Sequence, residues 1–339
     1  MKTFPQWLKI LLCIFSAIIA LILGIGIGSV YITPGEIAAV IANKIFALPL
    51  PETTTDITAA IIMNVRLPRA VAAFIVGAGL SAGGAVMQSV LANPLASGYT
   101  LGVASGASLG VTVTLFFGVT FLGIFTLPFM GFIFGLFTVL IAVTAASRFD
   151  RNTGSAAVIL IGMVMSLFVN AVVTLLMGLN KDAAKSVIFW QMGSFSGMDN
   201  KTVLIIFPIT LVIILLLLRY SRAMDLMTFG DEQALSAGVN SRFTKTLLLT
   251  LSSALTGAAV AFVGTIGFID LIAPHAVRKI FGAKHKIVIP MSAVAGGGFM
   301  VLSDLLARTV IAPVELPVGA VTAIIGAPIF AYIFLKKSK

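Results

Sequence analysis

Residues 10–30 read ILLCIFSAIIALILGIGIGSV, an apolar run of 21 residues without a charged side chain. A helix needs about 20 such residues to cross the hydrocarbon core of a bilayer. Lys2 and Lys9 precede the run, as basic residues precede the apolar core of a secretory signal peptide. That core, however, is only about 7–15 residues long and ends at a small-residue cleavage site, and no such site follows here. We therefore expect residues 8–31 to form a first membrane span that the protein keeps.

The whole chain has the composition of a membrane protein. Hydrophobic residues make up 59% of the 339 residues and charged residues only 10%, whereas a soluble domain has about 25% charged residues. The 22 basic residues give a net charge of +10, but they are spread along the chain rather than gathered in a stripe. The charge therefore does not indicate a nucleic-acid partner, and the lipid bilayer is the expected surrounding.

Further apolar segments follow the first one. We predict an all-α, polytopic protein with one transmembrane domain over residues 1–339 and about ten spans. They lie near residues 8–31, 69–91, 98–117, 124–147, 155–178, 201–219, 246–264, 268–281, 287–306 and 316–335. The longest cytoplasmic connection is 220–245. Outside, residues 32–66 are long enough for a short helix, and residues 179–200 carry Trp190 as an interfacial anchor.

The distribution of basic residues decides whether the short segment 268–281 crosses the membrane. With ten spans, 15 basic residues face the cytoplasm and seven face outward, which is the asymmetry of the positive-inside rule. With nine spans, the basic tail Lys336–Lys339 would lie outside. The charges therefore favour ten spans in the cell membrane, with both termini on the cytoplasmic side. The outward residues are then Lys44, Arg66, Arg69, Lys181, Lys185, Lys201 and Arg308.

The sequence offers no motif for catalysis or for a cofactor. It has no G-x-x-x-x-G-K-[ST] phosphate loop, no H-E-x-x-H zinc motif and no Ser/His/Asp grouping. His275 and His285 stand in a basic context and are predicted to be hydrogen-bonded or interfacial rather than metal ligands. Cys13, the single cysteine, is expected to behave as a small hydrophobic side chain. We predict no catalytic, metal-binding or cofactor-binding residue, which disfavours a membrane enzyme.

Carboxylates are scarce within the predicted spans. Asp270 and Asp304 lie at span ends, and Glu315 lies in an external turn. A carrier driven by an ion gradient normally keeps ionisable groups at mid-membrane. Only Asp304 could serve in that way here, so a secondary carrier remains the alternative of another class.

Two local patterns leave their roles open. Gly98, Gly102, Gly106 and Gly110 recur at every fourth residue, which predicts one smooth helix face. That face serves either close helix packing or a substrate path lined by small residues. The segment Arg66-Leu67-Pro68-Arg69 places two arginines outside, against the usual bias. They either reach the lipid headgroups or pair with carboxylates of an extracytoplasmic partner.

The order and spacing of several motifs resemble the FecCD-like permeases of type II ABC importers for ferric siderophores, haem and cobalamin. The resemblance covers almost the whole chain. It rests on Arg66-Leu67-Pro68-Arg69, Gly77-x-Gly79-Leu80, Met87-Gln88, Asn93-Pro94-Leu95-Ala96, Leu101-Gly102-Val103, Trp190-x-x-Gly193-Ser194, Gly264-x-Ile266-Gly267-Phe268-Ile269, Ala273-Pro274-His275-x-x-Arg278, Asp304-x-x-Ala307-Arg308, Glu315-Leu316-Pro317-x-Gly319 and Gly326-x-Pro328-x-Phe330.

The resemblance implies a permease subunit that acts only with partners. These are a second copy of the chain or a close paralogue, two cytoplasmic ATPase subunits and an extracytoplasmic substrate-binding protein. In such permeases, arginines at the positions of Arg66, Arg69 and Arg308 face acidic residues of the binding protein. The predicted function is ATP-driven import of an iron complex, with a ferric siderophore first and haem or cobalamin as alternatives. ATP hydrolysis would occur on the partners.

The resemblance also implies that the connection 220–245 couples the ATPase subunits to the spans, through Asp231, Glu232, Ala234 and Gly238. In physical terms, the two acidic residues suit the first turn of a short helix, and Gly238 permits a left-handed turn that ends it. Gln88, Asn93 and Pro94 join the four glycines as candidates for the substrate path or for helix packing. One departure is Asp270, since the family often has glycine at this position; the carboxylate either caps the eighth span or pairs with a basic residue.

Overall fold

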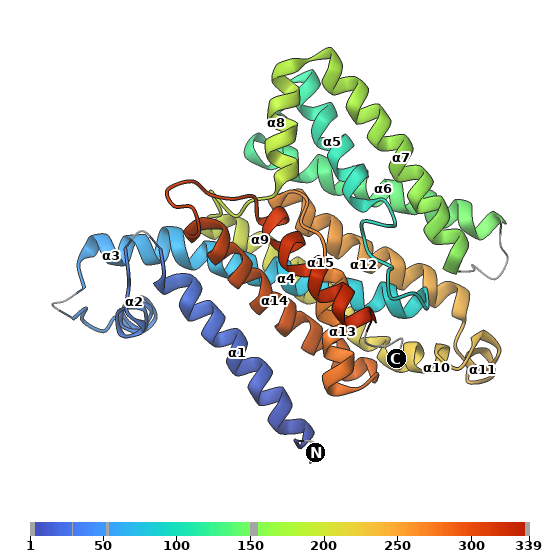
Figure 1. The fold of residues 1–339 in the computed structure, drawn as a ribbon, viewed down its shortest axis with the longest axis horizontal. Helices are drawn as coiled ribbons and strands as arrows, with labels where there is room; N and C mark the ends of the chain where they lie inside the picture. The colour runs from blue at the N-terminus through green and yellow to red at the C-terminus, as the bar shows by residue number, and fades with distance from the viewer. Residues whose placement is uncertain (1–3, 29, 52–53, 150–154, 336–339) are drawn as a thin grey trace.

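The computed structural model describes residues 4–28, 30–51, 54–149 and 155–335. Within these ranges all regular structure is helical, which confirms the predicted all-α fold (Figure 1). The elements are α1 (Gln6–Gly26), α2 (Pro34–Phe46), α3 (Asp56–Ile61), η1 (Ile62–Arg66), α4 (Leu67–Val90), α5 (Val103–Phe117), η2 (Gly123–Phe125), α6 (Thr126–Phe149), α7 (Ser155–Leu179), α8 (Lys181–Met192), α9 (Asn200–Arg219), α10 (Ser221–Met227), α11 (Asp231–Ser236), α12 (Ser241–Val263), α13 (Ile269–Phe281), α14 (His285–Thr309) and α15 (Val318–Leu335).

Each of the ten predicted spans contains a helix. Among the described residues, seven helical segments are long and apolar enough to cross a membrane: α1, the continuous segment from α3 to α4, η2 with α6, α7, α9, α12 and α14. Helices α5 and α15 are apolar but shorter, and α13 has only 13 residues, a length of about 20 Å. Five basic residues used in the charge argument, Lys2, Arg151, Lys336, Lys337 and Lys339, lie outside the described ranges.

Helix α4 lies at the centre of the molecule. It packs against α14, α12, α13 and α9, and 89% of its most apolar stretch is buried, against 17% for α9. Small residues permit this enclosure, because a Cβ added to Gly77 would overlap the backbone of Gly296 and one added to Gly84 would overlap the backbone of Asp270. Such close backbone approach is how helices associate without a hydrophobic driving force between them.

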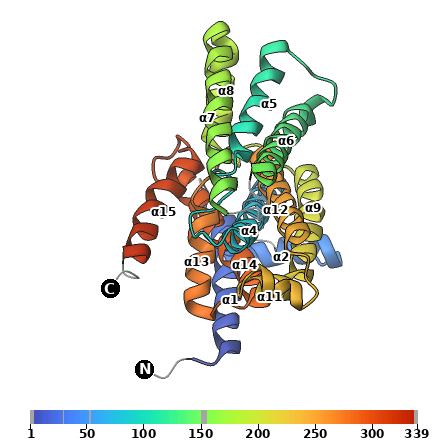
Figure 2. The same ribbon diagram turned by 90° about the vertical axis from the view of Figure 1, so that its right-hand side faces the viewer.

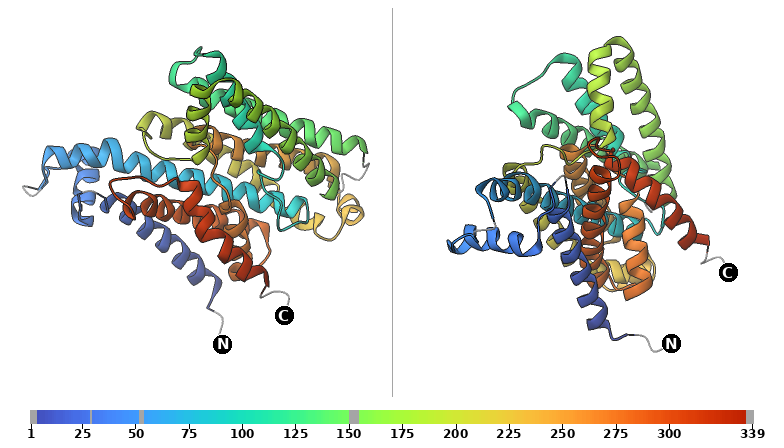
Figure 3. Two further views of the ribbon diagram at one scale, coloured as in Figure 1. Left: turned by 45° about the horizontal axis from the view of Figure 1, so that its top comes forward. Right: turned by 60° about the vertical axis from the view of Figure 1, so that its left-hand side comes forward.

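Two further parts flank this centre. Helices α5, α6, α7 and α8 pack on one another, and α6 joins them to α12; they form a group on one side of the central helices (Figure 1). Helix α15 contacts α13 and α14 and stands away from α9 and α12 (Figure 2). The start of α1 and the end of α15 lie on the same side of the molecule (Figure 3), as the predicted topology requires.

The chain enters α13 in the interior of the protein rather than at its surface. Residues 264–267 are not helical, and Phe268 adopts a left-handed conformation with φ of 69° before the helix begins. Irregular backbone at membrane depth is tolerated where protein buries it or where it borders a cavity. The predicted span 268–281 is therefore a short helix that begins inside the bundle.

Candidate functional site

The first candidate site is a cluster of arginines where α1 ends and α4 begins. Arg66, the last residue of η1, is only 5% exposed. Its Nη1 donates to the backbone carbonyls of Ile25 (3.0 Å) and Gly26 (2.9 Å), and its Nη2 donates to that of Val30. These carbonyls include the last ones of α1, which carry the negative end of the helix dipole. Arg66 therefore closes the end of α1.

Arg69 and Arg308 surround Asp304. Arg69 donates to both oxygens of Asp304, at 2.9–3.1 Å, and to both oxygens of Glu315, at 2.8 and 3.0 Å. Nε of Arg308 lies 3.7 Å from Oδ2 of Asp304, and its Nη2 donates to the carbonyl of Gly24. The Asp304 side chain is 3% exposed, whereas that of Glu315 is 39% exposed. The hydrogen bonds from Arg69 hold the pKa of Glu315 below its usual range.

The structure thus brings the three predicted docking arginines together at one end of the molecule. It also shows that each already has partners within the chain. The sequence analysis noted Asp304 and Glu315 but missed their pairing with Arg69. The sequence did contain a signal for this pairing. Only 12 residues of the chain are acidic, and two of them, Asp304 and Glu315, lie four residues before and seven residues after Arg308. Docking by the arginines stays a prediction.

The second candidate site lies at the opposite end of the bundle. Helix α11 carries Asp231 and Glu232 in its first turn, and Gly238 follows it with φ of 84°, so the expected short helix and left-handed turn are both present. Lys245 Nζ donates to Asp231 Oδ2 at 2.6 Å and fastens α11 to α12. Ala234 is buried, whereas Leu235 is 66% exposed. Ala234 therefore packs the helix in place, and the neighbouring side chains form its outer surface.

A hydrogen-bonded chain of Ser89, His285 and Asp225 connects this end to the central helices. Nδ1 of His285 lies 2.5 Å from Oδ1 of Asp225 on α10, and Nε2 lies 2.5 Å from Oγ of Ser89 at the end of α4. The sequence analysis found no Ser/His/Asp grouping, and that was wrong in space, because these residues are far apart in sequence. The prediction of a hydrogen-bonded His285 is confirmed. The three side chains tie α4, α10 and α14 together.

The predicted glycine face needs correction. Helix α5 begins at Val103, so Gly98 lies in the preceding turn and Gly102 is the N-cap with φ of 91°. Only Gly106 and Gly110 share a helix face, and each faces α6: a Cβ on Gly106 would lie 2.7 Å from the carbonyl oxygen of Phe134. The turn at 91–102 breaks the four-residue repeat, and the two helical glycines serve close packing.

The remaining path candidates lie between α4 and this turn. Gln88 is buried; its Nε2 donates to the carbonyl of Asp270 at 3.2 Å, and its Oε1 accepts from Arg278 Nη1 at 2.5 Å. It therefore joins α4 to both ends of α13. Asn93 Oδ1 accepts from the backbone N–H of Leu95 at 2.8 Å and shapes the turn, in which Pro94 is exposed.

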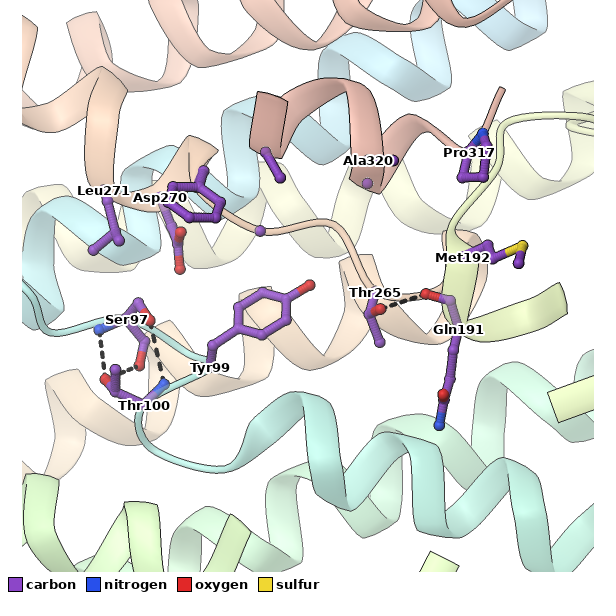
Figure 4. Close-up of a pocket in the computed structure, with 14 residues that line it drawn as sticks. Ser97, Tyr99, Thr100, Gln191, Met192, Thr265, Asp270, Leu271, Pro317 and Ala320 are labelled. Carbon is purple, nitrogen blue, oxygen red and sulfur yellow. Dashed lines mark hydrogen bonds between the residues drawn. The ribbon is translucent and has the colours of Figure 1, made fainter. Parts of the chain in front are cut away.

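A cavity of about 590 Å³ opens where α13 begins. Four parts of the chain line it: the turn before α5, the end of α8, the segment from Thr265 into α13, and the start of α15 (Figure 4). Its polar side chains are Ser97, Tyr99, Thr100, Gln191, Thr265 and Asp270. Of these polar residues, the sequence analysis singled out Asp270 alone, because it is the fold that brings the four segments together. The described residues include no group of three or more His, Cys, Asp or Glu side chains that could hold a metal ion.

Residues 16–336 match the model of the FecCD transport family. The chain is 38% identical over 325 residues to YvrB of Bacillus subtilis, an ABC transporter permease protein, covering 95% of this chain and 91% of that one. It is 36% identical to the cobalamin import permease BtuC of Halobacterium salinarum (85% and 77% covered) and 33% identical to the Fe(3+)-citrate import permease YfmE of Bacillus subtilis (96% and 94% covered). A solved metal-chelate-type ABC transporter in an inward-facing conformation superposes with a TM-score of 0.84 at 30% identity, covering 97% of this chain and 99% of that one.

Proposed function

Because this chain belongs to the FecCD transport family, we propose that it carries an iron complex, first of all a ferric siderophore, inward across the cell membrane. The chain is an ABC importer permease with the type II importer fold, and the family is one of transport permeases rather than enzymes. The iron assignment rests on the full-length likeness to an Fe(3+)-citrate import permease. Import of cobalamin is the second candidate, because a cobalamin permease is as similar, and haem stays open.

The two ends of the molecule support a division of labour between partners. We assign the arginine cluster to a substrate-binding protein outside the cell, and the segment 220–245 to two ATPase subunits in the cytoplasm. ATP binding on those subunits would move α11, and α11 would pass the motion to the spans of this chain and of a second copy or paralogue. The cargo would cross between the two permease subunits.

Arg69 and Arg308 are the stronger docking candidates of the three arginines. Each side chain is 11% exposed, and Arg69 already holds the exposed carboxylate of Glu315. An acidic side chain of a binding protein would meet the same guanidinium fork by taking the place of Glu315. Arg66 would act mainly by fixing the end of α1 beside them.

The test is reconstitution of the permease with its ATPase subunits and binding protein in proteoliposomes, followed by uptake of ⁵⁵Fe-labelled siderophore. Arg69→Glu with Arg308→Glu should weaken binding-protein docking by at least about tenfold, since like charges at an interface repel. Lys44→Glu is the matched control, because Lys44 is an exposed basic residue on α2, is predicted to face outward as the arginines are, and is not part of the cluster. Normal docking by the double variant would reject the assignment of the arginine cluster. Uptake of labelled cobalamin without uptake of the iron siderophore would show that cobalamin, not an iron complex, is the substrate.

A further inference from the structure

Asp270 is a buried carboxylate that has no side-chain partner among the described residues. The residue is 1% exposed, and neither Oδ1 nor Oδ2 has a hydrogen-bond partner among the described residues. No ion pair found within those residues includes it. An unpaired carboxylate in a low-dielectric interior is costly, so its presence calls for a physical reason.

The surroundings fix where this carboxylate points. The carbonyl of Asp270 accepts from Gln88 Nε2 at 3.2 Å, and the absence of a Cβ at Gly84 lets that backbone lie directly on α4. The side chain extends away from α4 toward the turn of Ser97, Tyr99 and Thr100, at the wall of the 590 Å³ cavity (Figure 4).

A second polar atom without a partner lies at the same cavity. The Tyr99 hydroxyl is buried and completes no hydrogen bond of ordinary geometry among the described residues, although the Thr265 hydroxyl and the backbone of Ile266 lie near it. It points toward Thr265, whose own hydroxyl already donates to the carbonyl of Gln191 at 2.5 Å (Figure 4). One wall of the cavity therefore presents a carboxylate and a phenol oxygen, both of which can accept hydrogen bonds.

The position of Asp270 in the fold does not fully explain why a buried carboxylate stands there. The residue lies in the first turn of α13, where the helix dipole favours a negative charge. Yet a capping role alone would leave no reason for an adjoining cavity and for a second acceptor beside it. The surroundings of Asp270 do not suit a metal ion either, since the described ranges contain no cluster of three or more His, Cys, Asp or Glu side chains. A single carboxylate with neighbouring hydroxyl oxygens suits an ammonium group, which donates three hydrogen bonds.

We propose that Asp270 and Tyr99 form a subsite for a positively charged nitrogen group of the transported chelate. The subsite would select cargo bearing an ammonium group as it passes this cavity. This inference rests on the proposed importer function, because the cargo must reach this cavity during import. The occupant is defined by charge and hydrogen-bond donors, not by the metal at the centre of the chelate.

The first experiment needs no transport. A hydrophobic carbodiimide labels protonated buried carboxyl groups, and mass spectrometry of the purified complex locates the labelled residues. The probes are a ferric trihydroxamate with a free terminal amine and the same chelate with that amine acetylated. The amine form, titrated to about 10 mM so that even a millimolar site is mostly occupied, should reduce labelling of Asp270 at least fivefold, by roughly the ratio expected from occupancy. A parallel reaction with a water-soluble carbodiimide, which reaches exposed carboxyl groups, should label exposed Glu232 equally with and without the chelate. Equal protection by the acetylated form, no protection, or an Asp270 that never reacts would each overturn the subsite.

The second experiment measures selectivity in proteoliposomes with one binding protein. Uptake of the amine chelate relative to the acetylated chelate should fall about tenfold in Asp270→Asn, an effect of one lost charge pair, while uptake of the acetylated chelate is retained. Tyr99→Phe, which keeps the ring, should lower the ratio less. Equal loss of both chelates would mean a structural role and overturn the proposal. If the wild type shows protected labelling but no ATP-driven uptake, the importer function fails and the subsite stands.

Discussion

The two ends that we assign to partners differ in how far their side chains are already paired within the chain. At the arginine end, Arg66, Arg69 and Arg308 are already paired with carbonyls and carboxylates of the same chain. At the other end, α11 leaves Leu235 exposed, and among the described residues the one ion pair of α11 joins Asp231 to Lys245. A partner at the first end has to exchange one ion pair for another, whereas a partner at the second end has to cover an available surface.

This difference has a consequence for mutation. Charges at the arginine end hold the fold together, and by the proposed function they also serve docking, so their removal should change both. Changes in α11 should affect coupling while leaving the fold intact, because few of its side chains reach the core.

The largest effect is expected for Arg66→Ala. The substitution removes the donors to Ile25, Gly26 and Val30, and each hydrogen bond to a charged group contributes about 1.5–3 kcal/mol. We expect loss of most folded permease, measured as detergent-extracted monodisperse protein and by its melting temperature. Arg66→Lys keeps the charge but not the forked guanidinium group, so its yield and melting temperature should lie between those of the wild type and of Arg66→Ala. A stable Arg66→Ala permease that only fails to bind its partner would contradict the structural role of this arginine.

The next effect is expected at the turn after α11. Gly238→Pro with Asp231→Lys should lower ATP-driven uptake by at least about tenfold, the effect of roughly 1.4 kcal/mol in coupling, without changing the melting temperature by much. Gly238→Ala isolates the turn, because φ of 84° strains any residue with a Cβ. Its control is Gly118→Ala. Gly118 also has a positive φ and open space around it, but it follows α5, on the side of the membrane predicted to face outward. Equal uptake by the two alanine variants would remove this turn from the coupling path.

The sequence predicted the parts of the fold that depend on local chemistry. Apolar runs of span length, the first-turn acids of α11 and the left-handed Gly238 each follow from neighbouring residues. The sequence did not predict features that depend on contact between distant segments. The Arg69–Asp304 pair, the Ser89–His285–Asp225 chain and the cavity beside Asp270 all join helices that are far apart along the chain.

The glycine repeat shows how a local pattern can mislead. Spacing of four residues from Gly98 to Gly110 predicted a continuous helix face, but Asn93 and Pro94 open a turn that continues to Gly102. A positive φ at Gly102 then starts the helix. The same residue type therefore serves turn geometry at one position and close packing at the next, and spacing alone does not distinguish the two uses.

A smaller effect is expected where the segment 220–245 meets the central helices, at Asp225 and His285. Asp225→Asn weakens the acceptor of His285, and His285→Gln removes the ring that joins α10 to α4. Each change should lower uptake per ATP hydrolysed about threefold, an effect below 1 kcal/mol, measured as the ratio of transported iron to released phosphate. Lys286→Gln is the control, because Lys286 is exposed and adjacent to His285. An unchanged ratio in both variants would limit the three side chains to holding the fold.

The smallest effect is expected for Glu315→Gln, which bears on the exchange of ion pairs at the arginine end. Glu315 is 39% exposed, and exposed ion pairs contribute only about 0–1 kcal/mol to stability, so the melting temperature should change little. Freed of this carboxylate, Arg69 should bind an incoming acidic side chain about twofold to threefold more tightly, measured as the affinity of the permease for surface-immobilised binding protein.

The same ion pair predicts a pH dependence. Because the hydrogen bond from Arg69 lowers the pKa of Glu315, the ion pair stabilises the fold above the carboxyl group's unfolded pKa of about 4.3 and is lost as pH falls through the lower folded pKa. Wild type and variant should therefore differ in docking at neutral pH and converge at acidic pH below that range. Weaker docking by Glu315→Gln at neutral pH would mean that Glu315 itself contacts the binding protein, and that this end too presents a ready-made surface.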